Sequence, residues 1–221
     1  MTDSQQTIMD LLKKATWDLH QKAETSPVEQ KLIKGTISRP HYAVFLEQRY
    51  LVHKRLDAAL RKARQENEHA KAVVHEYQFH TREIEADLRF YGVDPASVQP
   101  TPGTKRMAEY IDRIERENLV AVLGIQYVLE GSTNGARFIA RAIRMAFGLE
   151  TREGTRYLDP YGDEQRQYWG TFRAAMDARD FSDEERDAII DAARQTFITI
   201  IDLEKELEER MEEDGASSAV G

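Results

Sequence analysis

The sequence contains no cysteine among its 221 residues. A disulfide framework, a thiolate metal site and a cysteine nucleophile are therefore excluded. No stretch approaches the roughly 18–20 consecutive apolar residues that a membrane-spanning helix needs. Residues 1–6 also lack the basic and then apolar pattern of a signal peptide, so we expect a cytoplasmic protein without a membrane span.

An excess of basic residues is also missing. The formal net charge is −8 and the pI is near 5.4, which argues against nucleic acid as a partner because phosphate binding needs a concentrated basic face. The length favours one domain that buries roughly 70% of the surface exposed by its unfolded chain. Strictly alternating β-branched runs are absent, so the sequence predicts no sheet.

The chain therefore reads as a single all-α domain over residues 1–213, followed by a disordered tail at 214–221. Its six prolines lie at 27, 40, 95, 100, 102 and 160, outside the long periodic segments. Helices are expected over about 4–24, from 27, over 38–64, 70–90, 105–117, 118–147, 163–178 and 182–212, with loops at 91–103 and 150–162. Ser26 and Ser182 are the expected N-caps of two of these helices.

One histidine is distinguished by its context on the first expected helix. Lys13, Thr16, His20 and Glu24 follow one another at three- and four-residue spacing and so share a stripe beside the apolar face. A glutamate four residues after a histidine can hold one ring nitrogen, which leaves the other as a metal ligand. The same pair can also be an ordinary surface ion pair, and spacing leaves both interpretations open. By helical phase Trp17 is expected to face away from His20.

Glycines interrupt the expected helix over residues 118–147. Each interior glycine costs about 0.5–1 kcal/mol relative to alanine, so it is kept where the backbone bends or where something approaches it closely. Gly131 and Gly135 lie four residues apart on one face, and Gly124 is predicted to extend that face. We expect a groove there without side chains, wide enough for a flat ligand.

Two motifs in this order resemble the heme oxygenases. Residues 12–24 (LKKATWDLHQKAE) resemble the proximal helix of that family, and residues 127–136 (YVLEGSTNGA) resemble the distal-helix signature of its bacterial members. The similarity continues in residues 32–42, 50–56 and 196–207, so it extends from about residue 10 to 207.

The resemblance implies a helical bundle that holds heme between a proximal helix and a distal helix kinked at glycines. It implies cleavage of heme, with O₂ and electrons, to biliverdin, CO and ferrous iron. Because the sequence carries no flavin- or nicotinamide-binding motif, electrons are expected from another protein such as a ferredoxin or a reductase. The habit of the family predicts a monomer.

The resemblance also assigns roles to particular residues. His20 matches the iron ligand, Glu24 its neighbour, and Gly131 and Gly135 the distal glycines, beside which Ser132 and Asn134 are candidates for catalytic support. The residues expected to contact heme, several of them through its propionates, are Lys13, Thr16, Arg141, Arg173 and Phe197.

The sequence departs from the family at two positions. The animal-type enzymes carry an aspartate directly after the first distal glycine, and this chain has Ser132, as bacterial members do. Proton delivery is therefore expected through water, backbone carbonyls or another polar group. Trp169 stands where a second propionate-binding basic residue is expected, so the seating of heme can differ.

Three alternatives stay open. A non-degrading heme carrier or sensor would share the same binding residues. A di-iron oxidase of the same fold would need clustered carboxylates and histidines, for which Glu66 and His69 offer one spaced pair inside a fully polar stretch. Arg137, Arg141 and Arg144 form a stripe that is either a solvated face or a docking surface for an acidic electron donor. His75 and His80 are expected to be structural or exposed.

Overall fold

The computed structural model describes residues 6–218, and side-chain surroundings are described for residues 6–213. Within residues 6–218 all the regular elements are helices, joined by loops, and there is no strand. The all-α prediction is confirmed. The α-helices are α1 (Ile8–Glu24), α2 (Pro27–Ile33), α3 (Arg39–Glu66), α4 (Glu68–Val73), α5 (Thr81–Phe90), α6 (Pro102–Glu117), α7 (Val122–Phe147), α8 (Gln165–Asp177) and α9 (Asp183–Ser218).

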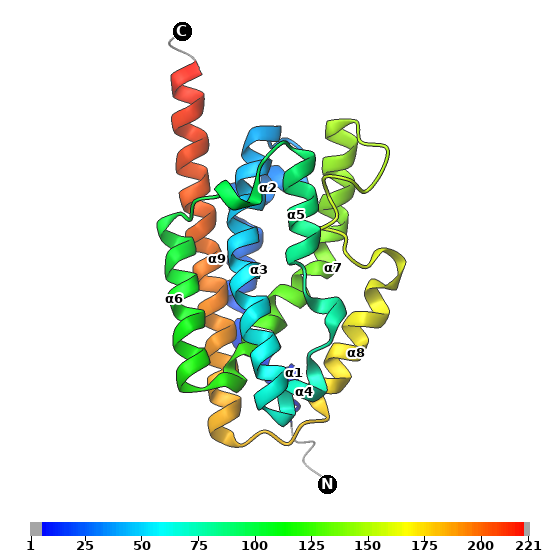
Figure 1. The fold of residues 1–221 in the computed structure, drawn as a ribbon, viewed down its shortest axis with the longest axis vertical. Helices are drawn as coiled ribbons and strands as arrows, with labels where there is room; N and C mark the ends of the chain where they lie inside the picture. Colours follow the sequence, from blue (N-terminus) through cyan, green and yellow to red (C-terminus); the bar gives the residue numbers. More distant parts are fainter. Residues whose placement is uncertain (1–5, 219–221) are drawn as a thin grey trace.

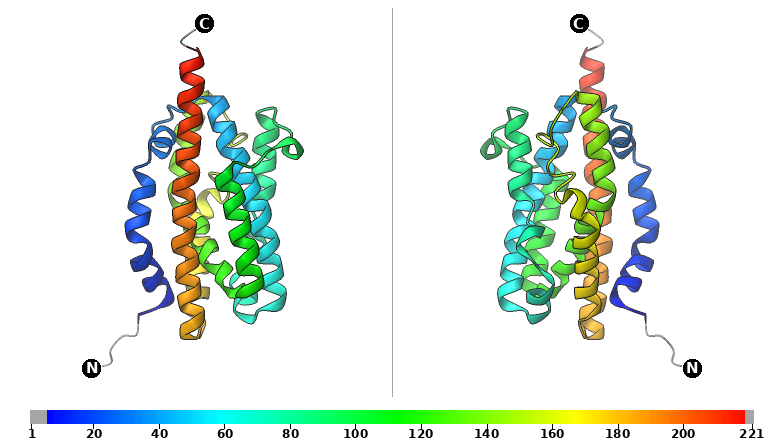
Figure 2. Two further views of the ribbon diagram at one scale, coloured as in Figure 1. Left: turned by 90° about the vertical axis from the view of Figure 1, so that its left-hand side faces the viewer. Right: turned by 90° about the vertical axis from the view of Figure 1, so that its right-hand side faces the viewer.

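Short 3₁₀ turns join several of these helices. They are η1 (Glu76–Gln78), η2 (Pro95–Ser97), η3 (Leu119–Ala121) and η4 (Gly162–Glu164). The longest helix, α9, packs along α7, α1 and α6 (Figure 1). In the side views of Figure 2, α1 lies on one side of α9, and α3 and α6 lie on the other.

Local capping explains where most helices begin. The Ser26 hydroxyl accepts from the backbone N–H of Glu29, with Pro27 at the first helical position. Ser182 and Glu185 form the predicted reciprocal box, with distances of 2.9 and 3.2 Å. The start of α1 differs from the prediction, because Thr7 caps the helix and places its first residue at Ile8 rather than near residue 4.

The prediction of one continuous helix over residues 70–90 is wrong. The chain leaves the helix after Val73, passes through extended residues and re-enters it at Thr81. The new helix is capped from outside, because Asp57 of α3 accepts hydrogen bonds from the backbone N–H and the hydroxyl of Thr81 at 3.1 and 2.5 Å. A cap supplied by another helix leaves no local sequence signal.

Helix α9 also extends beyond its predicted end near residue 212. It runs to Ser218 and therefore includes residues 214–218 of the expected tail. Residues 219–221 lie outside the described part of the chain, and the predicted disorder of the tail stays a prediction.

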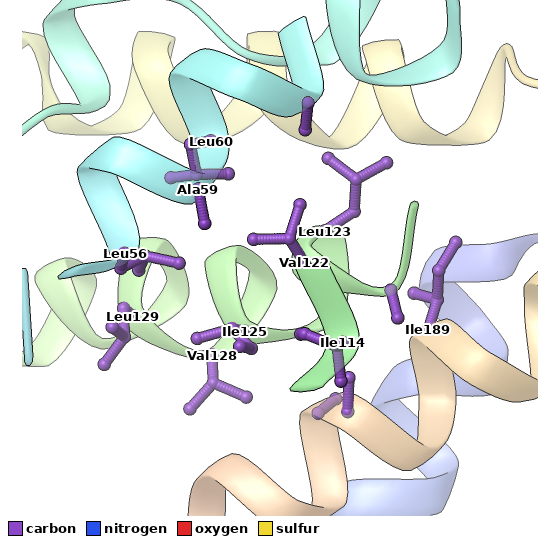
Figure 3. Packing of buried hydrophobic residues seen from close by; sticks show 14 of the residues in the cluster. Leu56, Ala59, Leu60, Ile114, Val122, Leu123, Ile125, Val128, Leu129 and Ile189 are labelled. Atoms are coloured by element: carbon purple, nitrogen blue, oxygen red, sulfur yellow. The ribbon is translucent and has the colours of Figure 1, made fainter. Parts of the chain in front are cut away.

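The main core forms where α3 meets the first turns of α7. Figure 3 shows Leu56, Ala59 and Leu60 of α3 packed around residues of α7 such as Val122 and Ile125. All five side chains are almost completely buried. Burying each of the larger ones contributes about 1.5–3 kcal/mol, so this contact fixes the first half of α7.

Gly124 belongs to this packing and not to a ligand groove. A Cβ at Gly124 would lie 2.0 Å from the carbonyl oxygen of Ile189 and 2.9 Å from the backbone nitrogen of Ala193, both in α9. The backbones of α7 and α9 therefore touch at this residue. The prediction that Gly124 extends the ligand face is wrong.

Candidate functional site

A cavity of about 860 Å³ lies between α1 and α7 and is bordered by residues of α2, α3, α8 and α9. Its volume is within the range of pockets that enclose a small ligand. Three of its lining side chains are large, apolar and strongly exposed, namely Trp17 at 52%, Ile33 at 44% and Phe138 at 66%. Because exposed apolar patches mark binding surfaces, the cavity suits a largely apolar ligand.

The α1 wall presents His20 to this cavity. Its Nδ1 lies 3.6 Å from Oε2 of Glu24, which is too long for a direct hydrogen bond. The ring is also held by the edge of Phe197, with centroids 5.7 Å apart, and it stacks on Trp17 at 6.0 Å. The predicted side-by-side placement of His20 and Glu24 is therefore present. The prediction that Trp17 faces away from His20 is wrong.

The α7 wall faces the cavity with Gly131 and Gly135. A Cβ added to Gly135 would meet nothing within 4 Å, and one added to Gly131 would lie 3.3 Å from the ring of Trp169. Unlike Gly124, Gly135 is therefore not required by packing. Its missing side chain keeps the cavity open.

Polar side chains directly after Gly131 bond back to the helix. Ser132, Thr133 and Asn134 donate to the carbonyl oxygens three residues earlier, at 2.7, 2.6 and 2.9 Å. Such bonds compete with the regular helix ladder and bend helices. Figure 1 shows α7 changing direction along its course. Ser132 and Asn134 both line the cavity, as expected.

One end of the cavity carries exposed cations. Lys13 of α1 and Arg173 of α8 both line it and are exposed to solvent. Thr16 is buried beside them, where its hydroxyl donates to the carbonyl oxygen of Leu12 at 2.8 Å and also bonds the Tyr127 hydroxyl. This end suits an anionic group that stays in contact with water.

Another part of the lining, supplied by α2, α3 and α9, carries charges that are partly or fully buried. Nη2 of Arg49 lies 3.5 Å from Oε1 of Glu204, which is only 5% exposed. Glu29 lines the same region. Burial, followed by the charge of Glu204, raises the pKa of Glu29 to about 7. Sequence reasoning missed all three residues, because no local spacing connects them.

A buried polar network lies behind the glycine wall. Glu130, directly before Gly131, is completely buried, and its Oε2 accepts hydrogen bonds from Tyr161 at 3.0 Å and Gln126 at 3.3 Å. The Tyr161 hydroxyl also lies 3.3 Å from Nε2 of His80. Burial and the neighbouring carboxylate raise the pKa of Tyr161 far above its usual value, so it remains a hydroxyl donor.

This network continues to a second histidine and reaches the cavity. Nε2 of His53 lies 3.1 Å from the Tyr157 hydroxyl, and the rings of His53 and His80 meet edge to face at 5.8 Å. Burial, followed by the charge of His80, holds the pKa of His53 well below its usual value. His80 and Tyr157 both line the cavity. A sign of this network in the sequence is the pair Gln126 and Glu130, two polar residues four apart in an otherwise apolar run.

Arg141 is the one predicted site residue that the structure does not bring to the cavity. It is exposed and lines a separate surface depression with Arg144 and Arg152. Six residues at 100° each place it about 120° around α7 from Gly135, which explains the separation. All the other predicted site residues, namely Lys13, Thr16, His20, Glu24, Gly131, Ser132, Asn134, Gly135, Arg173 and Phe197, line the cavity.

The family model described as heme oxygenase matches residues 6–206. The chain belongs to the heme oxygenase family. Heme oxygenase 1 of Rattus norvegicus is 24% identical over 218 residues, which cover 95% of this chain and 74% of that protein. Heme oxygenase 2 of Synechocystis sp. is 27% identical over 198 residues, which cover 84% of this chain and 77% of that protein.

Solved structures support the same heme oxygenase fold. Heme oxygenase-1 from the cyanobacterium Synechocystis sp., solved in complex with heme, superposes with a TM-score of 0.87 at 17% identity, covering 97% of this chain and 98% of that one. Heme oxygenase from Leptospira interrogans gives 0.84 at 21% identity, covering 91% and 100%. A domain of unknown function from Shewanella denitrificans also shares the fold, with a TM-score of 0.71 at 16% identity, covering 95% of both chains. The fold alone therefore leaves the activity open.

Two further features concern the rival interpretations. Within residues 6–218, no group of three or more histidine, aspartate or glutamate side chains is arranged to hold a metal ion. Glu66 and His69 are no exception, and His69 instead lies 3.7 Å from Glu185. The same part of the chain contains no helix that combines the length and apolar character needed to cross a bilayer.

Proposed function

We propose that this member of the heme oxygenase family is an active heme oxygenase, which cleaves heme with O₂ and electrons to biliverdin, CO and ferrous iron. The observation that carries the proposal is the pairing of His20 with two glycines of α7, Gly131 and Gly135, across one cavity. A planar apolar substrate fits between these two walls. The cations at one end suit its propionates.

The residues of α1 hold the substrate from one face. His20 ligates the heme iron through Nε2, because Glu24 lies beside Nδ1 and favours the proton there. Lys13 and Arg173 bind propionates at the exposed end, and Thr16 and Phe197 contact the macrocycle. The ion pairs of Lys13 and Arg173 with the propionates also fix how the heme is rotated within its own plane.

The residues of α7 leave room at the other face. When bound, heme supplies the redox chemistry, with its own meso carbon as the site of attack. Gly131 and Gly135 allow the backbone close to the substrate, so that only a small molecule such as O₂ or water fits between them. Any side chain at Gly135 would occupy that space.

Protons reach the α7 wall without the aspartate of the animal-type enzymes. Ser132 and Asn134 hold their hydrogens toward backbone carbonyls, where ordered water can exchange with them. The buried hydrogen-bonded network of Glu130, Tyr161 and His80 borders the cavity through His80. We infer that this network keeps the α7 wall supplied with protons.

Electrons come from a separate protein, because the sequence carries no flavin- or nicotinamide-binding motif. Arg137 and Arg141 are exposed on α7, and this acidic chain offers there a basic surface to an acidic donor such as a ferredoxin. Arg144 contributes less, because its guanidinium is engaged by Asp159 at 3.5 Å and by Thr155 at 3.1 Å.

An optical titration with hemin, followed by a reductant in air, tests the proposal. We expect a saturating Soret band at one hemin per chain, which then decays with ascorbate or with ferredoxin and its reductase while bilin absorbance rises in the red. The released CO is measured with a hemoprotein trap. A protein that forms no 1:1 complex with hemin would refute the proposal.

A heme carrier or sensor is the second candidate, which the serine at position 132 keeps open. It predicts the same Soret band, stable for hours under reductant and air. Catalase added to the assay removes free peroxide, so that any decay of the band reflects turnover within the complex. A band that persists under these conditions would favour the carrier over the oxygenase.

A further inference from the structure

The charged groups of Arg49, Glu29 and Glu204, here called the inner trio, have no role in the proposed chemistry; Glu204 is buried, and Arg49 and Glu29 are partly buried. They come from three different helices, α3, α2 and α9, and all three line the cavity. The guanidinium of Arg49 lies over the Phe45 ring, 5.1 Å from its centroid, and the Glu204 carboxylate also shares a hydrogen bond with the Ser26 side chain. Buried charges in a cavity made for an apolar ligand indicate a polar feature on that ligand.

One atom of the inner trio lacks a protein partner. Glu204 is 5% exposed, and its Oε2 has no hydrogen-bond partner among residues 6–213. Its other oxygen faces Arg49 at 3.5 Å. A buried carboxylate oxygen without a hydrogen-bond donor raises the free energy of the protein. A ligand that donates a hydrogen bond to this oxygen would remove that cost, whereas an apolar ligand would not.

The charge balance of the inner trio selects among polar groups. Two carboxyls stand against one guanidinium, and the Glu29 carboxyl, with a pKa raised to about 7 by burial and by Glu204, is partly protonated at neutral pH. An anionic propionate there would meet Glu204 as well as Arg49. A neutral hydroxyl can instead donate to Oε2 of Glu204 and accept from Arg49, which carries only donors.

The exposed end of the cavity carries cations, and this difference from the inner trio sets the orientation of the bound heme. Lys13 and Arg173 carry the cations that propionates need and stay in contact with water. With the propionates there, the opposite edge of the macrocycle is directed into the protein, toward the inner trio. In protoheme that edge carries only vinyl and methyl groups, which cannot satisfy Glu204.

We propose that the inner trio is a specificity site for a heme whose edge opposite the propionates carries a hydroxyl-bearing substituent. The inference rests on the proposed binding of heme between α1 and α7, and it defines the substrate class of that site. Arg49 and Glu204 are the residues that recognise the hydroxyl. Glu29 limits the negative charge around it.

Equilibrium titrations with three hemins test this specificity. Protohemin has two vinyl groups on that edge, mesohemin has two ethyl groups, and hematohemin has two 1-hydroxyethyl groups of nearly the same size. We expect the unaltered protein to bind hematohemin about tenfold more tightly than mesohemin, the factor that one additional buried hydrogen bond supplies. Affinities within twofold of each other would overturn the proposal.

A triple variant, Arg49→Met with Glu204→Met and Glu29→Gln, removes every charge of the inner trio, so that no lone carboxylate is left in this part of the cavity lining. Replacing a buried ion pair by apolar residues of similar volume is often neutral for stability. We expect the preference for hematohemin to disappear in this variant. If circular dichroism shows that this variant does not fold, Glu204→Gln is measured instead. It must lower the ratio of the affinities for hematohemin and mesohemin. An unchanged ratio in either variant refutes the proposal.

The matched control is Lys13→Met at the exposed end. It weakens all three hemins alike and leaves their ratio unchanged, because Lys13 contacts the propionates that they share. The binding and turnover of protohemin separate the proposed oxygenase activity from the proposed specificity site. Binding without turnover refutes the oxygenase but not the specificity site, whereas failure of every hemin to bind refutes both.

Discussion

The α1 and α7 walls of the cavity are built in different ways. On α1 the functional feature is a half-exposed side chain, His20, which is held by near neighbours on α1 and α9. On α7 the functional feature is the lack of a side chain at Gly131 and Gly135, and behind it lies a buried network centred on Glu130. The α1 wall therefore depends on one side chain, whereas the α7 wall depends on its exposed backbone and on the buried network that supports it.

The difference predicts how each wall responds to change. The α1 wall can be altered one side chain at a time, because His20 is joined to the rest of the protein by few contacts. The α7 wall is coupled to α3, α5 and the segment before α8 through His53, His80 and Tyr161. Substitutions on α7 should therefore have three kinds of effect: on the stability of the fold, on the space in the cavity and on the supply of protons to the substrate.

The largest effect is expected from His20→Ala. Loss of an outer-shell partner of a metal ligand already costs about 10–100-fold in affinity, so loss of the ligand itself should weaken hemin binding at least about a hundredfold. The Soret band should also lose the signature of histidine ligation and regain it when imidazole is added. His75→Ala, a half-buried histidine outside the cavity lining, is the control. An unchanged spectrum in His20→Ala would remove His20 from the site.

The next effect compares two glycines of the same helix. Gly124→Ala forces a methyl group into the backbone of α9 and should destabilise the free protein by about 1–3 kcal/mol. Gly135→Ala meets open space and should stabilise it by about 0.5–1 kcal/mol through helix propensity, while weakening hemin binding. Chemical denaturation and hemin titration of both variants give the test. Equal changes in stability would contradict the distinction.

The difference between Gly124 and Gly135 also shows which features of the site could be predicted from the sequence. Spacing along single helices predicted that His20 lies beside Glu24 and that Gly131 and Gly135 share a face. The roles of these residues came from the resemblance to the family. Gly124 follows the same spacing and yet serves packing. Helical phase tells which residues share a side of a helix, but not what that side meets, and Ile189 of α9 lies 65 residues away in sequence.

Features built across helices were invisible for the same reason. The break after Val73 depends on a cap from Asp57, the network on Tyr161 meeting Glu130, and the inner trio on three separate helices. Arg141 was assigned from the resemblance to the family, and its angular position about 120° around α7 from Gly135 carries it off the cavity. Local patterns thus predicted the helices and the two facing walls, but not the contacts that support them.

A third variant, Glu130→Gln, asks whether the network behind α7 serves turnover. The amide keeps the shape and most hydrogen bonds but cannot hold a negative charge, so hemin binding should be unchanged while the rate of bilin formation falls about tenfold. The pH dependence of that rate should change with it, which a purely structural role would not cause. Glu47→Gln on α3, outside the cavity lining, is the control. An unchanged rate and pH profile would restrict Glu130 to a structural role.

The smallest effect distinguishes two exposed arginines, Arg173 on α8 and Arg141 on α7. Arg173 lines the cavity and Arg141 does not, although both are candidates for propionate contact. Since exposed ion pairs contribute about 0.2–1 kcal/mol, Arg173→Ala should weaken hemin binding about two- to fivefold, with a difference that shrinks as salt is added. Arg141→Ala should leave hemin binding unchanged and instead raise the KM for an acidic ferredoxin. The opposite result, with hemin affinity lost in Arg141→Ala alone, would mean that the substrate sits closer to the end of α7 than the cavity lining indicates, and that the propionates turn toward the surface depression beside Arg144.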